Sequence, residues 1–266
     1  MKKSDISNDR RLYLKKKTSA KVLTLITQVL ILVFILGLWE LLAHLKVIDS
    51  FLMSRPSEIA STIASLFKTG ELTTHILTTL YETMLGFLIA TAVGTAIALI
   101  LWWSEFLRRV LEPYIVVLNS LPKIALGPII IVWFGAGTKS IVFMAILITV
   151  IVTIITMLNG FMAVEQGKLL LMRSLGASKV QILYKLVIPA SIPTFISCLK
   201  INVGMAWIGS IMGEYLVSKQ GIGYLIVYGG QVFRLDLVMA STVILCVLAG
   251  LMYLGVAILE KILVKK

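Results

Sequence analysis

The stretch MRSLGASKVQILYKLVIPASIP, residues 172–193, is basic and amphipathic in a chain that is otherwise strongly apolar. Its second half places apolar residues at helical spacing and keeps its basic residues off that stripe. Gly176 precedes this half, and a glycine commonly ends one helix and lets the chain turn. We therefore predict two short helices joined by a bend, with Pro189 and Pro193 breaking the second helix before the next apolar run.

A bent, basic and amphipathic helix pair has two physical interpretations. Its apolar face could lie on the lipid interface, with the basic residues among the headgroups. It could instead dock into a groove on a soluble partner. Periodicity alone leaves both interpretations open.

The composition of the whole chain is that of a polytopic membrane protein. Of the 266 residues, 59% are hydrophobic and only 14% are charged, and the mean hydropathy is +0.99. Soluble domains carry about 25% charged residues. A spanning helix needs about 20 predominantly apolar residues, and its backbone polar groups must be satisfied within the helix. We therefore predict an all-α membrane protein with six spans, at residues 22–44, 79–103, 114–134, 140–162, 195–217 and 237–259.

The distribution of basic residues predicts the orientation of these spans. The net charge is +12, and most Lys and Arg fall in segments that six alternating spans place on one side of the membrane. Cytoplasmic loops carry an excess of Lys and Arg, so we expect both termini in the cytoplasm and no nucleic-acid partner. Residues 1–21 then form a basic cytoplasmic tail that contacts membrane lipid, and residues 22–266 form a single transmembrane domain. The first apolar run is too long for a cleaved secretory signal.

Two spans carry features that a simple anchor does not need. The third contains Pro122, Lys123 and Pro128, and the fifth contains Glu214 in its outer half. Ionisable residues are costly in lipid, and breaks in membrane helices tend to occur where backbone lines a cavity. These four residues are our candidates for the translocation path. A buried structural pair of Lys123 and Glu214 is the alternative interpretation.

The second span carries a small residue at every fourth position: Gly86, Ala90, Gly94 and Ala98. Such a stripe lets another helix approach closely, either within one subunit or between two subunits. The sequence leaves both arrangements open. Glu82, on the same span, lies nearer the outer end, where we expect its side chain to reach the interface.

Signatures of catalysis are missing from the sequence. It contains no H-E-x-x-H, no G-x-S-x-G and no G-x-x-x-x-G-K-[ST], so we expect neither an enzyme nor a chain that binds a metal or cofactor. Energy from ATP would have to come from a partner. The alternative is an ion-coupled secondary carrier that acts without an ATPase, but such a carrier needs an intramembrane carboxylate pathway and usually internal repeats, and neither is apparent.

The basic segment and its approach resemble the cytoplasmic signature loop of type I ABC-importer permeases. The family pattern is Glu-Ala-Ala, three residues, Gly, nine residues, Ile-x-Leu-Pro. Gly176 and Pro189 match that spacing, whereas the triplet is Leu-Leu-Met instead of Glu-Ala-Ala, and Glu165 occupies a position where the family often has Asp. The resemblance implies a coupling loop at about residues 163–193, whose site residues are Glu165, Leu170, Leu171, Met172, Arg173, Gly176, Ala177, Leu186 and Pro189.

The resemblance covers nearly the whole chain after residue 22, with a permease core at about residues 72–262. The stretches LPKIALGPIIIVWFGAGTKS and GMAWIGSIMGEYLVSKQGIGYLI are similar to the subgroup that serves nitrate, sulfonate, taurine and vitamin precursors. The resemblance implies a multi-pass protein of a prokaryotic cell membrane that works as a homodimer. Its implied partners are cytoplasmic ABC ATPase subunits, which hold ATP and Mg, and an extracytoplasmic binding protein.

Overall fold

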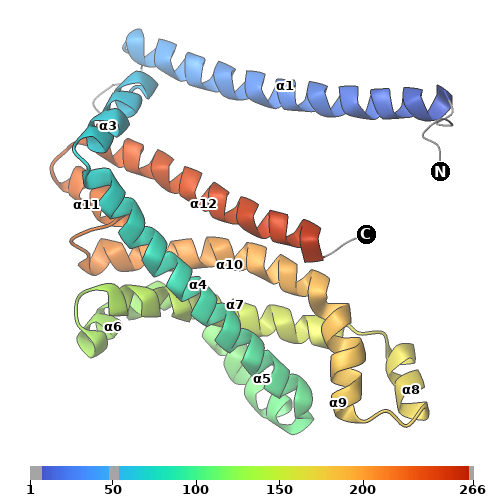
Figure 1. The fold of residues 1–266 in the computed structure, drawn as a ribbon. Coiled ribbons are helices and arrows are strands. Elements are labelled where there is room, and N and C mark those ends of the chain that lie inside the picture. The colour runs from blue at the N-terminus through green and yellow to red at the C-terminus, as the bar shows by residue number, and fades with distance from the viewer. Residues whose placement is uncertain (1–7, 48–53, 264–266) are drawn as a thin grey trace. The chain divides into compact units, whose positions relative to one another are not determined.

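The computed structural model describes residues 8–47 and 54–263. It forms two compact units, residues 1–62 and 63–266. Every regular element in the described ranges is helical, which confirms the predicted all-α class (Figure 1). Within the described residues, five helices qualify as membrane spans by length and apolar composition, and the number rises to six when one bent helix pair is counted as a single span.

The first unit contains the long helix α1 (Asn8–His44) and the beginning of α3 (Pro56–Lys68). The apolar side chains of α1 are exposed from residue 22 to residue 38, as expected for a helix that lies in lipid. Near its end, the Glu40 carboxylate accepts hydrogen bonds from the Ser57 backbone N–H at 3.1 Å and from the Ser57 hydroxyl at 2.8 Å. A carboxylate at this position stabilises the first turn of α3.

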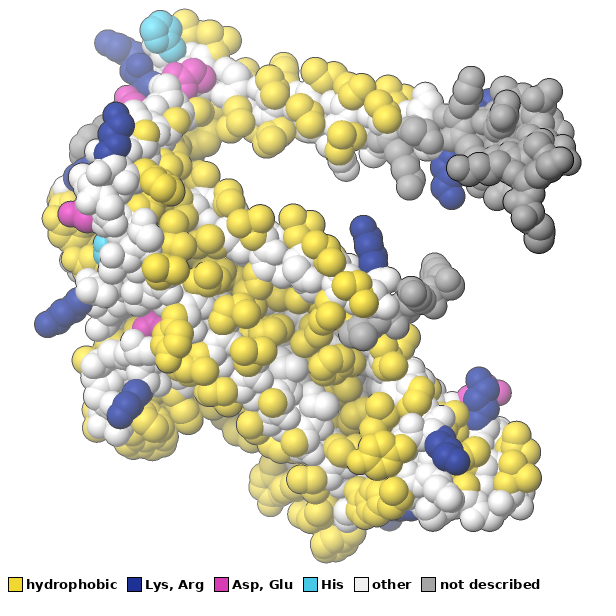
Figure 2. All heavy atoms as spheres, viewed as in Figure 1, with side chains coloured by type: hydrophobic (Ala, Val, Ile, Leu, Met, Phe, Trp, Pro, Cys, Tyr) yellow, Lys and Arg dark blue, Asp and Glu magenta, His cyan; other side chains and the backbone are white. Residues whose placement is uncertain are grey.

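The second unit holds four long apolar helices: α4 (Glu71–Trp103), α7 (Thr138–Met162), α10 (Ile188–Val217) and α12 (Leu235–Leu263). They correspond to the second, fourth, fifth and sixth predicted spans. The short helix α11 (Ile222–Gln231) joins α10 to α12. Figure 2 shows hydrophobic side chains spread over the face that α4, α10 and α12 present, the surface that lipid requires.

The centre of the second unit is a three-helix contact in which α4 and α10 both pack on α7. Glycines permit the close approach. A Cβ added at Gly86 would lie 2.6 Å from the Ala145 Cβ, and one added at Gly94 would lie 2.6 Å from the Thr153 Cβ. The small-residue stripe of the second span therefore packs inside one subunit, against α7.

The third predicted span, residues 114–134, is interrupted as its prolines indicate, and the interruption is a sharp bend. Its parts are α5 (Glu105–Ser120), a 3₁₀ turn (Lys123–Leu126) and α6 (Gly127–Phe134), and the two arms meet at 87°. Leu121, at the end of α5, is extended because the following Pro122 disfavours helical backbone at the residue before it. Arg108 and Arg109 lie in the first turns of α5.

The prediction that Pro189 and Pro193 break the helix is wrong. The helix runs without interruption from Lys179 to Val217, through α9 (Lys179–Ile182), a π-turn (Leu183–Val187) and α10. In that turn the Ile188 N–H bonds to the Leu183 carbonyl. The wider π geometry relieves the clash that a proline ring would make with the preceding turn, so the chain absorbs Pro189 without ending.

Candidate functional site

The coupling segment begins with α8 (Gln166–Ser174), which follows directly on the end of α7. Leu170 and Leu171 point to solvent and are 67% and 61% exposed, and Leu175 just beyond the helix is 74% exposed. Met172 turns inward instead and packs against the buried cluster beneath the segment. Three large apolar side chains are thus held outward on one short helical element, an arrangement typical of a docking surface.

The bend after α8 depends on Gly176. Its φ of +77° lies in the left-handed region that glycine enters at little cost. The Gly176 N–H bonds to the Arg173 carbonyl at 2.9 Å, and the Ala177 N–H bonds to the Met172 carbonyl at 3.0 Å. This is the hydrogen-bond pattern of a glycine-terminated helix, and it confirms the predicted bend.

The next helix begins at once with a reciprocal cap. The Gln181 N–H donates to the Ser178 hydroxyl at 3.3 Å, while the Ser178 N–H donates to the Gln181 side-chain oxygen at 2.8 Å. Ser178 and Gln181 were not among the predicted site residues, although Ser-x-x-Gln after a glycine is a recognisable start signal. The cap fixes where α9 starts relative to α8.

The far end of the coupling segment is anchored in the membrane helices. Ile182, Leu183 and Val187 are buried in a cluster with Ala98 of α4 and with residues of α7 and α10. The predicted site residue Leu186 packs at the edge of the same cluster. Because α9 is continuous with α10, a displacement of the segment is transmitted directly to a membrane-spanning helix.

Lys179 forms a second anchor at the base of α9. Its ammonium group donates to the Trp103 carbonyl at 2.5 Å and lies 5.1 Å from the centroid of the Trp103 ring. The contact ties the coupling segment to the end of α4. Glu165 at the other end of the segment makes an exposed ion pair with Lys168 at 2.9 Å, which contributes little to stability.

The interior of the three-helix core is polar at several levels. The Asn202 side-chain amide donates to the hydroxyls of Thr91 and Thr153, each at 2.9 Å, and so joins α10 to α4 and α7. Closer to α11, the hydroxyls of Thr83 and Ser210 lie 2.6 Å apart. All five side chains are buried, and hydrogen bonds of this kind hold membrane helices together in register.

A carboxyl pair lies at the same helix contact. Glu82 and Glu214 are each only 1% exposed, and their carboxyl groups are neighbours. The expectation that Glu82 reaches the membrane interface is therefore wrong, because its side chain points between helices. Among the described residues, Glu82 Oε2 and Glu214 Oε1 have no hydrogen-bond partner, and a proton on one of the two carboxyl groups would supply the missing donor.

The first turn of α11 is clasped by side chains from α4 and α10. Three successive N–H groups, those of residues 221, 222 and 223, donate to His75 Nδ1 at 2.9 Å, Thr79 Oγ1 at 2.7 Å and Glu214 Oε2 at 2.5 Å. A helix leaves its first N–H groups without internal partners, and here all three acceptors come from other helices. Glu214 is thus fixed inside the subunit.

The structure does not bring Lys123 and Glu214 together. Lys123 is half-buried at the bend, where its ammonium group donates to the Asn119 carbonyl at 3.1 Å. The ion pairs within the described ranges do not include one between Lys123 and Glu214. The alternative of a buried Lys–Glu pair is therefore not realised. Pro122 and Pro128 flank the same bend and are exposed.

Three comparisons identify the architecture. The family model described as "Binding-protein-dependent transport system inner membrane component" matches residues 83–266. The chain belongs to this family. A probable ABC transporter permease protein of Haemophilus influenzae is 30% identical over 233 residues, which cover 87% of this chain and 94% of that protein.

Further matches agree with the assignment. SsuC of Bacillus subtilis, a putative aliphatic sulfonates transport permease protein, is 28% identical over 231 residues, covering 87% of this chain and 84% of its own. A chain of a bacterial alginate ABC transporter, solved in complex with an alginate pentasaccharide-bound periplasmic protein, superposes with a TM-score of 0.65 at 16% identity, covering 97% of this chain and 98% of that one. The protein is a multi-pass ABC-importer permease of a prokaryotic cytoplasmic membrane.

For this permease, the polar residues that sequence reasoning missed share one signal. Thr79, Glu82 and Thr83 continue the stripe of Gly86, Ala90, Gly94 and Ala98 upstream at helical spacing, so they fall on the face that packs on other helices. On α10, nothing in the local sequence separates Asn202, which is buried, from Ser197, which is exposed. Their difference arises only from the packing of the helices.

Proposed function

We propose that this permease is the membrane half of an importer that is driven by separate ATPase subunits. In this proposal a cytoplasmic ABC ATPase binds ATP and Mg, an extracytoplasmic binding protein delivers the solute, and a second copy of the chain completes the path. Both termini and the coupling segment lie in the cytoplasm. The charge distribution supports this orientation, and the alginate transporter, solved with its periplasmic protein, is a precedent for the arrangement.

One observation carries the proposal. Leu170, Leu171 and Leu175 project from α8 and its C-terminal end, and the bend at Gly176 joins α8 to α9, which continues into α10. Exposed apolar side chains on this segment can bind a soluble partner, and the continuous helix can transmit the partner's movement into the membrane. ATP binding to the partner would then switch the membrane helices between two packings.

The face of α10 that carries Ile201, Ile208 and Leu216 supports a second copy. These side chains are exposed although α10 packs on α7, α4 and α12. They recur at helical spacing and form a stripe that α7 and α4 leave uncovered. We propose that the stripe faces its equivalent in a second chain, across or beside the solute path.

The same proposal assigns the bend of the third span to the solute path. Lys123, Pro122 and Pro128 lie where the 3₁₀ turn interrupts the span, and irregular backbone at membrane depth is tolerated where it lines a cavity. Glu214 takes a different role from the one expected, since its side chain is closed off within the subunit. It supports the path by holding α11.

The relatives support a substrate class. We propose a small solute of the sulfonate, taurine, nitrate or vitamin-precursor type. The B. subtilis relative supports a sulfonate, and relatives named as taurine and formylaminopyrimidine transport permeases support two other members of this set. A half-buried Lys123 at the bend suits an anion. Titration of the partner binding protein with sulfonates, nitrate and pyrimidines, by calorimetry, tests this assignment. A binding protein that takes none of these classes would contradict it.

The coupling assignment is tested by Gly176→Val. A β-branched residue at a φ of +77° is strained, so the turn would rearrange and misplace α8. We expect ATPase activity stimulated by the loaded binding protein to fall about tenfold or more in proteoliposomes. Gly250→Val is the matched control, because a Cβ at Gly250 meets nothing within 4 Å and its backbone lies outside the left-handed region. Undiminished stimulation in Gly176→Val would overturn the assignment.

An ion-coupled carrier remains the competing function, and the Glu82–Glu214 pair is the feature that favours it. Proton-driven transport requires carboxyl groups that reach both sides of the membrane in turn. Here both groups are closed off between helices. Solute uptake by proteoliposomes that hold the permease and binding protein, with and without the ATPase, separates the two functions. Uptake without the ATPase would support the carrier.

A further inference from the structure

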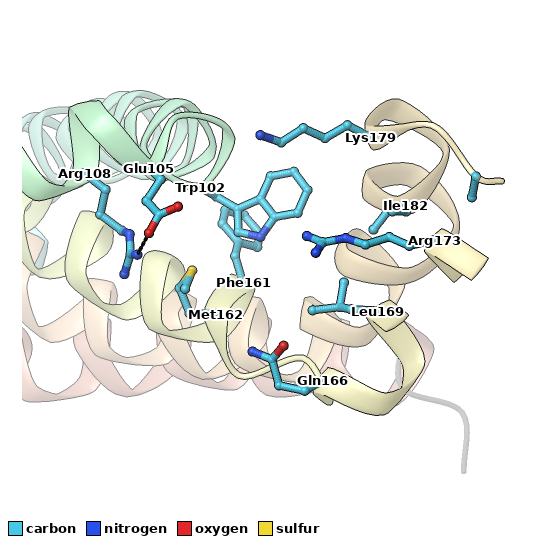
Figure 3. Close-up of a pocket in the computed structure, with 11 residues that line it drawn as sticks. Trp102, Glu105, Arg108, Phe161, Met162, Gln166, Leu169, Arg173, Lys179 and Ile182 are labelled. Atoms are coloured by element: carbon cyan, nitrogen blue, oxygen red, sulfur yellow. Dashed lines mark ion pairs between the residues drawn. The ribbon is translucent and has the colours of Figure 1, made fainter. Parts of the chain in front are cut away.

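A basic pocket lies beside the coupling segment, between that segment and the turn that joins α4 to α5. Its volume is about 460 Å³. Figure 3 shows Arg173 and Lys179 reaching toward Trp102 from the coupling segment, with Arg108 and Glu105 on the opposite wall. Three cations from three different helices therefore converge on one cavity that holds a single carboxylate.

The Glu105 carboxylate pairs mainly with Arg109, a residue outside the pocket. Glu105 Oε1 lies 2.7 Å from Arg109 Nη2 but 3.8 Å from Arg108 Nη2, and Arg109 does not line the pocket. Arg173 has no ion pair within the part of the chain that the structure describes. The pocket thus presents an excess of positive charge that the protein itself does not neutralise.

The remaining wall of the pocket is apolar. Trp102, Phe161, Leu169 and Ile182 form it, and Phe161 also lines a second cavity of about 770 Å³. The second cavity is an almost wholly apolar groove along α4, α7, α10 and α12, and its wall includes the exposed Ala96. The basic pocket and the apolar groove therefore share one lining side chain, Phe161.

We propose that this composite site binds an acidic phospholipid of the cytoplasmic leaflet. Arg108, Arg173 and Lys179 hold the headgroup phosphate, and an acyl chain lies along the apolar groove past Phe161. A free anion would leave the apolar groove unfilled, and a lipid without net negative charge would leave the three cations unneutralised. Two tryptophans, Trp102 and Trp103, mark this level as a membrane interface, where basic pockets between helices suit anionic headgroups.

The lipid would act on the coupling segment itself. Arg173 belongs to α8, Lys179 begins α9, and Arg108 belongs to α5, so a single headgroup bridges the segment to the third span. This adds a lipid contact to the direct bond between Lys179 and the Trp103 carbonyl. The proposal is independent of the direction of transport, since it concerns only lipid retention by the permease.

The experiment measures lipid binding to the purified permease–ATPase complex by native mass spectrometry. Phosphatidylglycerol and phosphatidylcholine are titrated separately in mild detergent, where membrane orientation plays no part. We expect preferential retention of phosphatidylglycerol, a loss of affinity of about fivefold in Arg108→Gln, and a loss of about 25-fold in Arg108→Gln/Arg173→Gln. Arg108→Lys keeps the charge and is expected to keep most of the affinity.

Lys185→Gln is the matched control. It removes one positive charge from the coupling segment, but the Lys185 side chain is exposed and outside the pocket. We expect its phosphatidylglycerol affinity to match that of the unmodified protein. An equal loss in Lys185→Gln would show a general surface effect and overturn the site. Helicity by circular dichroism and retention of the ATPase verify that each variant is folded.

A second pair of measurements separates the lipid from a soluble phosphate. Ala96→Phe fills the groove without touching the cations, so it is expected to weaken phosphatidylglycerol several-fold and to leave soluble glycerophosphoglycerol unchanged. Inorganic phosphate at the same concentration is expected to displace little lipid. Full displacement by inorganic phosphate, together with normal lipid affinity in Ala96→Phe, would show a soluble-anion site and refute the lipid assignment.

Discussion

The Glu214 carboxylate accepts a hydrogen bond from the Gly223 backbone N–H at 2.5 Å, so the end of α10 holds the first turn of α11. The contact leaves no room for a side chain at Gly223. A Cβ there would lie 2.8 Å from Glu214 Oε2 and 2.9 Å from Glu214 Cβ. This glycine is therefore required by close approach, since the carboxylate occupies the space that any other residue would need.

Gly223→Ala is accordingly expected to lower the free energy of unfolding by about 2 kcal/mol, the usual cost of overpacking a tight contact. The measurement is reversible unfolding in detergent, followed by tryptophan fluorescence. Gly230→Ala, in the same helix, is the control, because a Cβ at Gly230 meets nothing within 4 Å. Equal stabilities of the two variants would show that the Glu214 contact is not as tight as described.

Asn202→Ala tests the hydrogen bonds that join the three core helices. The substitution removes two bonds, to Thr91 and Thr153, and is expected to cost about 1–2 kcal/mol of unfolding free energy. Ser197→Ala on the same helix is the control, since the exposed Ser197 hydroxyl bonds only to the Pro193 carbonyl of its own helix. Thermal unfolding in detergent compares them, and a loss as large in Ser197→Ala would refute the assignment.

The exposed leucines of α8, Leu170 and Leu171, predict that the ATPase is bound through an apolar contact. Replacing both Leu170 and Leu171 by Glu removes two exposed apolar side chains and is expected to weaken ATPase association at least tenfold. Because the contact is apolar, association of the unmodified proteins should depend only weakly on salt. The permease is immobilised on a surface, and the affinity of the ATPase for it is measured at a series of salt concentrations.

Lys168→Gln serves as the control for that prediction. It removes a charge from the same helix and breaks the exposed pair with Glu165. We expect the affinity for the ATPase to change less than twofold, since such pairs contribute little. Assembly that is lost steeply as salt increases, or a large effect of Lys168→Gln, would show that charge rather than apolar contact governs docking.

Glu82→Ala and Glu82→Gln test the buried carboxyl pair. Alanine leaves a cavity and removes the partner of Glu214, so we expect a loss of about 2–3 kcal/mol in unfolding free energy. Glutamine keeps the shape and brings an amide donor to the oxygen of Glu214 that has none, so its stability should stay within about 1 kcal/mol of the unmodified protein. If glutamine were as damaging as alanine, a shared proton would not describe the pair.

Much of the architecture was predictable because lipid imposes simple rules. Apolar runs long enough to span must be helical, because lipid offers no partner for a free backbone N–H or C=O group. The bend at Gly176 was equally readable, since only glycine adopts its backbone conformation at little cost. These features depend on single segments and their solvent, so the neighbouring helices do not change them.

The errors arose where one segment depends on another. Pro189 lies inside a continuous helix because a π-turn, buried by α4 and α7, accommodates its ring. Pro122 bends the third span through 87° instead of merely interrupting it. A proline in the sequence shows where a helix hydrogen bond is missing, but the packing of neighbouring helices determines whether the helix kinks, widens or ends there.

The sequence by itself determined an all-α membrane protein with a glycine-bent basic segment, because composition, periodicity and backbone preference act locally. The resemblance to type I ABC-importer permeases added the expectation that this segment couples to an ATPase. Only the tertiary structure decided that Glu82 meets Glu214, that Asn202 joins three helices, and that Arg108, Arg173 and Lys179 converge on one pocket. The members of each set come from different helices. Their chemistry comes from the packing of helices, which brings together side chains that no local pattern relates.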